Sequence, residues 1–205
     1  MNNKLISGLC RQLDASPTSR HVIEYLAKQL LNNGFTDCTN HKEIQSKNSN
    51  GFITRAGSLV VWRTGSQDIR NGFHIVGAHT DSPGLKLKPQ PDESRFGWQT
   101  LQVEIYGSPL LNSWLDRDLG IAGHAVLRNG SVRLFCESTP LARISQLAIH
   151  LDREVNERGL TLNKQLHLSS AWATDKGTET FQVWLAKQIK TKQSDIVAVD
   201  AQLFG

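Results

Sequence analysis

The chain has no stretch that approaches the roughly 18 consecutive apolar residues of a membrane-spanning helix. Its N-terminus, MNNKLISGLCRQLDAS, also lacks the apolar core of about 7–15 residues that marks a secretory signal. Both absences lead us to expect a cytoplasmic protein that makes no membrane contact.

Cysteine and nucleotide-binding motifs are also scarce. The three cysteines, Cys10, Cys38 and Cys136, lie far apart and form no Cys-x-x-Cys pair, so neither a disulfide framework nor a thiolate zinc site is indicated. In the cytoplasm we expect their thiols to be reduced. The phosphate-binding motifs GxGxxG and GxxxxGK(S/T) are absent, as is the GxSxG nucleophile motif. These absences argue against a nucleotide-binding protein or a serine hydrolase.

Positive charge is not concentrated anywhere in the chain. The 205 residues contain 23 Lys and Arg against 19 Asp and Glu, a net charge of +4. The excess is spread over the first half, without a basic run or a basic patch interleaved with aromatic residues. A weakly basic, solvated surface explains it at least as well as nucleic-acid binding does. We expect no nucleic-acid partner, and real binding would weaken steeply with salt.

The first third of the chain has the pattern of a helix followed by strands. Ser16 suits the N-cap of a helix, Pro17 its first position, and Gly34 its C-terminal stop. The apolar segments 57–65 and 72–80 are bounded by glycines and predict short strands. A helix followed by nearly continuous apolar strands favours an α/β sheet that is buried on both faces.

Near residues 86–97 the composition changes, because two prolines and clustered charges predict a domain boundary. Beyond it, Asn129-Gly130 is a strong signal for a tight hairpin between strands. The further elements that we expect are strands within 98–107 and 123–138, helices over 141–157 and 175–190, and a last strand over 196–204.

The segment GAHTDSP, residues 77–83, places an imidazole and a carboxylate two residues apart where an apolar run ends. Ligands of open α/β sheets lie beyond the carboxyl ends of strands, and a neutral imidazole is a common zinc ligand. Asp81 could hold the His79 ring in one tautomer, and Pro83 restricts Ser82 to extended geometry. The alternative is a strand-end histidine beside an aspartate that caps a turn.

Three motifs in the same order resemble the aspartyl aminopeptidase family of zinc metallopeptidases. They are GAHTDSPGLKLKP, YGSPLLNSWLDRDLGIAGHAVL and ISQLAIHLDREVNERG. The resemblance runs from about residue 15 to the last residue and implies the following organisation. Residues 1–90 would form the N-terminal part of a zinc-peptidase domain of α/β architecture, 91–195 an inserted β-rich dimerisation domain that also contacts substrate, and 196–205 the first strand of the return to the peptidase domain.

The resemblance also implies an activity and roles for residues. The family removes N-terminal residues, preferring acidic ones, from peptides with a free N-terminus, and it uses two zinc ions. His79 matches the first zinc-ligand histidine, and Asp81 matches the catalytic-site aspartate that supports it. His150 matches a histidine of the inserted domain that appears as a metal ligand or as a substrate-binding residue supplied by a neighbouring subunit. A homo-oligomer formed through the inserted domain is therefore expected.

Two further features bear on this interpretation. The Asp116-Arg117-Asp118 run is a family signature whose residue types predict a buried charge network or an interface contact rather than catalysis. No Glu-Glu dipeptide occurs, so the resemblance leaves the family's catalytic glutamates and other metal ligands without counterparts. We expect a fragment or truncated product that is inactive alone. The alternative is a non-catalytic oligomerisation module that partners a full-length relative.

Overall fold

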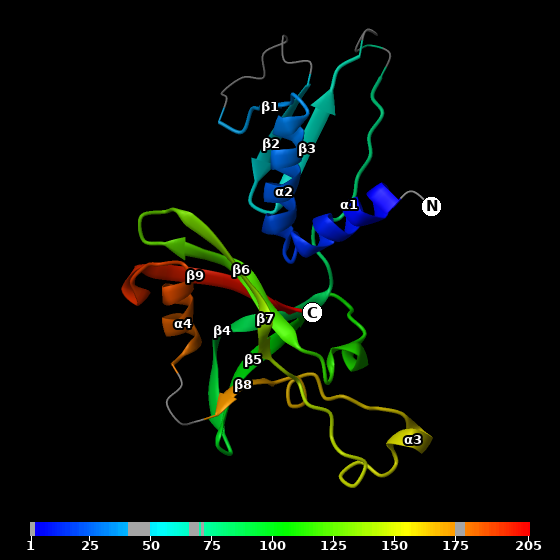
Figure 1. The fold of residues 1–205 in the computed structure, drawn as a ribbon, viewed down its shortest axis with the longest axis vertical. Coiled ribbons are helices and arrows are strands. Elements are labelled where there is room, and N and C mark those ends of the chain that lie inside the picture. The colour runs from blue at the N-terminus through cyan, green and yellow to red at the C-terminus, as the bar shows by residue number, and fades with distance from the viewer. Residues whose placement is uncertain (1–2, 41–49, 66–69, 71, 175–178) are drawn as a thin grey trace. The chain divides into compact units, whose positions relative to one another are not determined.

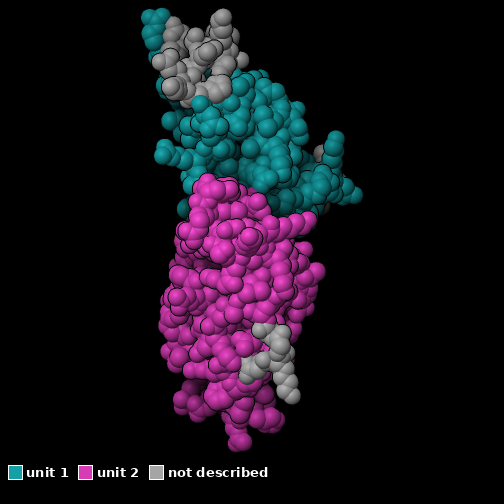
Figure 2. All heavy atoms as spheres, turned by 90° about the vertical axis from the view of Figure 1, so that its left-hand side faces the viewer, with its two compact units in different colours: residues 1–82 teal, residues 83–205 magenta. Residues whose placement is uncertain are grey.

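The computed structural model describes residues 3–40, 50–65, 70, 72–174 and 179–205. The chain divides into two compact units, residues 1–82 and 83–205, coloured separately in Figure 2. Each unit is described by itself. The assignment of the ranges 1–90, 91–195 and 196–205 to a peptidase domain, an inserted domain and a returning strand stays a prediction. In the described part of the chain, no helix is both long and apolar enough to cross a membrane.

Unit 1 combines two helices with a small sheet. Its elements in chain order are α1 (Asn3–Asp14), α2 (Ser19–Asn32), β1 (Thr36–Asp37), β2 (Asn50–Arg55) and β3 (Ser58–Arg63). The sheet order is β1-β2-β3, with β1 parallel and β3 antiparallel to β2. Phe52 on β2 is fully buried, and α2 lies beside the sheet (Figure 1). Of the two strand pairs in the described part of unit 1, one is therefore parallel.

The predicted helix is confirmed as α2, but its N-cap is wrong. Thr18, rather than Ser16, has extended backbone angles, and its side-chain oxygen accepts a hydrogen bond from the backbone N–H of His21. The helix begins at Ser19, so Pro17 lies before it. Gly34 has a φ of 80°, the left-handed conformation that ends helices. The two ends of α2 were thus marked by the correct residue types, shifted by two positions at the start.

Of the two strands predicted in unit 1, one is confirmed and one is wrong. Residues 58–63 form β3, but residues 72–80 have no strand ladder. Phe73, Ile75 and Val76 in the latter segment are strongly exposed. A strand exists only by pairing its backbone with another strand, and no described strand pairs with this segment. The predicted α/β sheet buried on both faces is therefore corrected to a mixed α/β fold, in which β3 also exposes Val60 and Val61.

Unit 2 is built on a six-stranded sheet whose neighbouring strands are all antiparallel. The strand order is β7-β6-β9-β4-β5-β8. The strands are β4 (Gly84–Arg95), β5 (Trp98–Tyr106), β6 (Leu119–Leu127), β7 (Val132–Ala142), β8 (Ser170–Thr174) and β9 (Ile196–Phe204). The Asn129-Gly130 hairpin and the last strand are confirmed, and β9 lies between β4 and β6 (Figure 1).

The helix predicted over 141–157 is wrong except for its last turn. Residues 141 and 142 end β7, and only α3 (Val155–Arg158) is helical. Ile144 is buried and forms a bridge with Leu115, so tertiary pairing took residues whose apolar spacing favoured a helix. The later helix is confirmed in part as α4 (Phe181–Gln188), while residues 175–178 lie outside the described residues.

The hydrophobic core of unit 2 lies between the sheet and α4. Trp184 on α4 stacks on Phe181 and meets the rings of Phe135 and Trp172 edge to face. The same core contains three fully buried side chains from different strands, Leu85, Leu101 and Ile121. Two short 3₁₀ helices, Leu111–Trp114 and Gln193–Asp195, complete the unit. The segment that contains His150 follows β7 of this sheet.

Candidate functional site

The predicted His79–Asp81 pair is formed in the structure. His79 Nδ1 lies 3.1 Å from Asp81 Oδ1. Thr80, the residue between them, lies at a bend of the chain. Its hydroxyl donates a 2.7 Å hydrogen bond to the carbonyl oxygen of Gly57 in the β2–β3 turn. The threonine thus anchors the bend that separates the two residues of the pair.

The exposure and hydrogen bonding of the pair suit a metal ligand with an orienting partner. The side chain of His79 is 91% exposed, and that of Asp81 is 38% exposed. An ionised carboxylate only accepts hydrogen bonds, so Asp81 holds the neutral ring in the tautomer with its proton on Nδ1. The Nε2 lone pair of His79 is then available to a metal ion. The pair faces solvent and is not sealed in an apolar interior.

His150, the third predicted residue, lies in unit 2 and is not on a helix. It occupies an exposed turn in which the backbone N–H of Leu151 donates to the carbonyl oxygen of Ala148. His79 and Asp81 belong to unit 1, whereas His150 belongs to unit 2. The predicted roles of His79 and His150 as metal ligands, of Asp81 as a catalytic residue and of His150 in substrate binding stay predictions.

The described residues fit one coordination position of a zinc ion rather than a closed site. Across the parts of the chain that the structure describes, no three His, Cys, Asp or Glu side chains gather closely enough to hold a metal. A catalytic zinc has three protein ligands and an open position. His79 with Asp81 matches a single ligand and its supporting carboxylate, so the described residues define no complete reaction step.

The Asp116-Arg117-Asp118 run takes part in a charge network, but not the predicted buried one. The cation is Arg143, whose NH1 lies 2.9 Å from Asp118 Oδ1 and whose Nε lies 3.9 Å from Asp116 Oδ1. At least half of each of these three side chains is exposed. The sequence motif predicted that Asp116 and Asp118 take part in ion pairing. It did not predict their partner, because Arg143 lies 25 residues after Asp118 in the chain.

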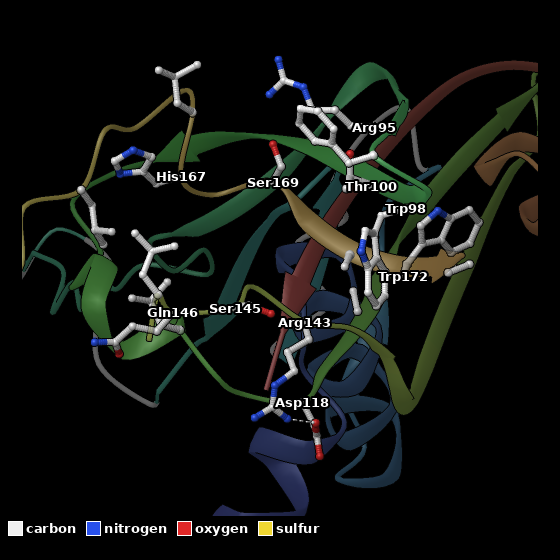
Figure 3. A pocket seen from close by; sticks show the side chains of 18 of the residues that line it. Arg95, Trp98, Thr100, Asp118, Arg143, Ser145, Gln146, His167, Ser169 and Trp172 are labelled. Carbon is white, nitrogen blue, oxygen red and sulfur yellow. Dashed lines mark hydrogen bonds and ion pairs between the residues drawn. The ribbon is translucent and has the colours of Figure 1, made fainter. Parts of the chain in front are cut away.

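A hollow of about 950 Å³ in unit 2 was not anticipated from the sequence. It lies between β5, β8 and the segments 140–147 and 160–169, with leucine side chains on its walls. Figure 3 shows Asp118 and Arg143 joined at one end and His167 at the other. Its volume is in the range of pockets for small organic ligands.

The pKa values of His21, Cys136 and Glu137 are perturbed. Burial lowers the pKa of His21, and the charge of Glu24 partly opposes this effect. Burial and the neighbouring Glu137 charge both raise the pKa of Cys136. Hydrogen bonds from the backbone and side chain of Thr139 lower the pKa of Glu137. These groups mark local packing in α2 and β7 rather than the His79 segment.

Comparison with known proteins decides the family. Residues 12–205 match the family model described as aminopeptidase I zinc metalloprotease, M18. The chain belongs to the M18 family of aminopeptidases. The resemblance to aspartyl aminopeptidases is thereby confirmed at the level of this family, whose description names zinc. The matched range includes both His79 and His150.

Curated M18 relatives are considerably longer than this chain. A probable M18 family aminopeptidase 2 from Streptomyces avermitilis is 48% identical over 161 residues, which are 78% of this chain and 37% of the relative. Its counterpart from Mycobacterium tuberculosis is 39% identical over 195 residues, which are 93% of this chain and 45% of the relative. The chain thus spans less than half the length of these relatives.

The fold of this chain matches part of several solved structures. Ape4, solved in complex with Nbr1, is 30% identical with a TM-score of 0.83, over 94% of this chain and 42% of that one. The Thermotoga maritima M18 aminopeptidase has a TM-score of 0.79 at 20% identity, over 98% of this chain and 47% of that one. Saccharomyces cerevisiae Ape1, described as a dodecamer, has a TM-score of 0.75 at 22% identity, over 98% and 48%.

Proposed function

We propose that residues 1–205 contribute a zinc ligand and its orienting carboxylate to a zinc-dependent M18 aminopeptidase. This enzyme would remove N-terminal residues, preferentially acidic ones, from peptides with a free N-terminus. The observation that carries the proposal is the 3.1 Å pairing of His79 with Asp81 on an exposed segment of a chain in this family. His79 would bind the metal through Nε2, and Asp81 would fix the ring's orientation.

The other ligands of the zinc ion would come from residues other than the His79–Asp81 pair. When bound, zinc polarises the scissile carbonyl and lowers the pKa of a bound water. The contribution of this chain is positional, because Asp81 sets the tautomer of His79 and Thr80 anchors the segment between them through Gly57. Two zinc ions are part of the proposal, as is the acidic preference.

His150 extends the proposal to an assembly of subunits. It lies on an exposed turn flanked by exposed apolar side chains, where a partner subunit can reach it. We place it as a metal ligand or substrate-binding group of a neighbouring subunit in a homo-oligomer. The dodecamer described for Saccharomyces cerevisiae Ape1 supports an oligomeric arrangement.

A chimera tests this function. Residues 1–205 are joined to the remainder of the Streptomyces avermitilis relative, and hydrolysis of Asp-, Glu- and Leu-p-nitroanilide is measured with and without zinc. The native chimera should cleave the acidic substrates faster, and His79→Ala should abolish cleavage. His74→Ala is the matched control, because His74 is an exposed histidine of the same segment. Full activity of His79→Ala in a zinc-dependent chimera would refute the assignment.

A second candidate function is a non-catalytic oligomerisation module. It is favoured by the hydrophobic core of unit 2, whose members all lie within residues 83–205 and include residues of the edge strand β7, while Trp172 of the other edge strand, β8, packs against it. Size-exclusion chromatography with light scattering, on the chain alone and mixed with a full-length relative, tests it. A mixed complex supports the module. A chain that stays monomeric and elutes separately from the relative contradicts it.

A further inference from the structure

The segment that leads to His150 is fixed to the sheet of unit 2 through its backbone. Arg143 and Ala171 exchange two backbone hydrogen bonds of 2.9 Å. The side chain of Ile144 is 1% exposed, and its carbonyl oxygen accepts a 2.8 Å hydrogen bond from the backbone N–H of Asp116. Residues 143 and 144 are therefore held from both sides, by β8 and by the turn before β6.

Three charged side chains extend this attachment to residue 146. Asp116 Oδ1 accepts a 3.2 Å hydrogen bond from the backbone N–H of Gln146, and Arg143 donates a 2.9 Å hydrogen bond to Asp118 Oδ1. Asp116 itself has a φ of 54°, a left-handed conformation that aspartate tolerates better than most residues. We call Asp116, Asp118 and Arg143 the clasp. Figure 3 shows the Asp118–Arg143 pair at the edge of the hollow.

Beyond the clasp, the chain exposes apolar side chains around His150. Leu147, Ile149 and Leu151 are 60%, 45% and 74% exposed. Leu147 also lines the hollow in unit 2, so the segment has an apolar surface beside it against which it could collapse. The direction in which the chain leaves Gln146 therefore determines whether these side chains and His150 face outward.

We propose that Asp116, Asp118 and Arg143 are positioning residues that set this direction and keep His150 accessible to a partner. The proposal rests on the proposed function for what His150 does there, whereas the positioning is a property of this chain alone. Exposed ion pairs contribute little to global stability. The clasp should therefore act on the local order of 146–151 and leave the unfolding of unit 2 almost unchanged.

The test compares four variants of the 205-residue chain by NMR. Asp116→Gly removes the acceptor oxygen, and glycine adopts the positive φ of this position readily. Asp116→Asn keeps an acceptor oxygen, and asparagine also adopts a positive φ. Asp118→Asn removes the charge that Arg143 binds. Asp200→Asn is the matched control, because it breaks an exposed pair with Lys86 of similar length, 3.0 Å, elsewhere on the sheet.

The expected result is local. In Asp116→Gly the Gln146 amide should exchange about tenfold faster with solvent, as befits the loss of one hydrogen bond, and the ¹⁵N order parameter of His150 should fall. Asp118→Asn should lower that order parameter too, Asp116→Asn should restore native values, and Asp200→Asn should change neither. All four variants should keep the melting temperature within about 3 °C, since exposed pairs are weak.

Two results would overturn the positioning role. One is native exchange and order at residues 146–151 in both Asp116→Gly and Asp118→Asn. The other is a loss of protection spread evenly over the sheet with a matching fall in melting temperature, which would make the clasp a global structural element. Amide exchange, order parameters and melting temperature do not depend on catalysis. These results are therefore independent of the chimera experiment, in which the His79→Ala variant tests the proposed function.

Discussion

Replacing Gly123 by alanine should destabilise the sheet of unit 2 by about 2 kcal/mol. Gly123 lies in the middle of β6, paired with Ala201 of β9. A Cβ atom at position 123 would overlap the carbonyl oxygen of Asp200 and lie 2.7 Å from Cα of Ala201. Both obstacles are backbone atoms of a central strand, so relief requires β6 and β9 to separate locally.

The magnitude follows from two opposing effects. Overpacking a well-packed interior costs about 1–3 kcal/mol, and a rigid backbone obstacle places this site at the upper end. Alanine also restricts the unfolded chain, which returns about 0.4–1 kcal/mol. Gly84→Ala is the matched control, because Gly84 lies in β4 of the same sheet and its Cβ would meet only Trp114 ring atoms, at 3.6 Å. That variant should be neutral or slightly stabilised.

Urea unfolding followed by tryptophan fluorescence measures the difference. Four of the five tryptophans, Trp98, Trp114, Trp172 and Trp184, lie in residues 83–205, so the signal reports unit 2. Gly123→Ala should lower the midpoint relative to both the native chain and Gly84→Ala. A Gly123→Ala variant as stable as Gly84→Ala would refute the close packing of β9 against β6, and with it the central position of the last strand.

Three further predictions concern the core, the thiols and pH. Leu203→Ala, at a side chain that is 1% exposed, should destabilise unit 2 by about 2–5 kcal/mol in urea unfolding, whereas exposed Leu110→Ala should stay within about 0.5 kcal/mol; equal effects would contradict the assigned core. With iodoacetamide at pH 8, mass spectrometry should find exposed Cys10 alkylated before Cys136, whose pKa is raised by burial and by Glu137, and buried Cys38 last; faster labelling of Cys38 would be inconsistent with its burial. Because burial lowers the pKa of folded His21, the unfolded chain binds more protons, so the contribution of His21 to stability is full above the unfolded value of 6.5 and is lost as the pH falls from there through the lower pKa of the folded state; urea unfolding followed by circular dichroism should show a flatter pH profile for His21→Asn, and an unchanged profile would contradict the shift.

The sequence predicted best those elements whose signals are local. A glycine stop marks the end of α2, and the Asn129-Gly130 hairpin depends on Gly130, whose φ is 82°. The His79–Asp81 contact is local too, because a single residue, Thr80, separates the two side chains at a bend of the chain. Adjacent residues therefore contained enough information to predict these features.

The errors lie where distant residues decide the structure. The apolar spacing of residues 141–157 favours a helix, yet Ile144 is taken into the core by pairing with Leu115, and the leucines after it stay exposed. Residues 72–80 have the composition of a strand, but no described strand pairs with them. The clasp joins Asp118 to an arginine 25 residues later, a pairing that no local pattern announces.

The central claim is that His79 binds zinc and that Asp81 orients the His79 ring. Zinc affinity tests it most directly. The dissociation constant is measured in the chimera by competition with a chromogenic chelator, for the native protein, His79→Ala, Asp81→Asn and His74→Ala. Loss of an orienting partner typically weakens metal binding about 10–100-fold, so Asp81→Asn should fall in that range, His79→Ala should weaken binding further, and His74→Ala should match the native protein. Native affinity in His79→Ala would contradict the claim.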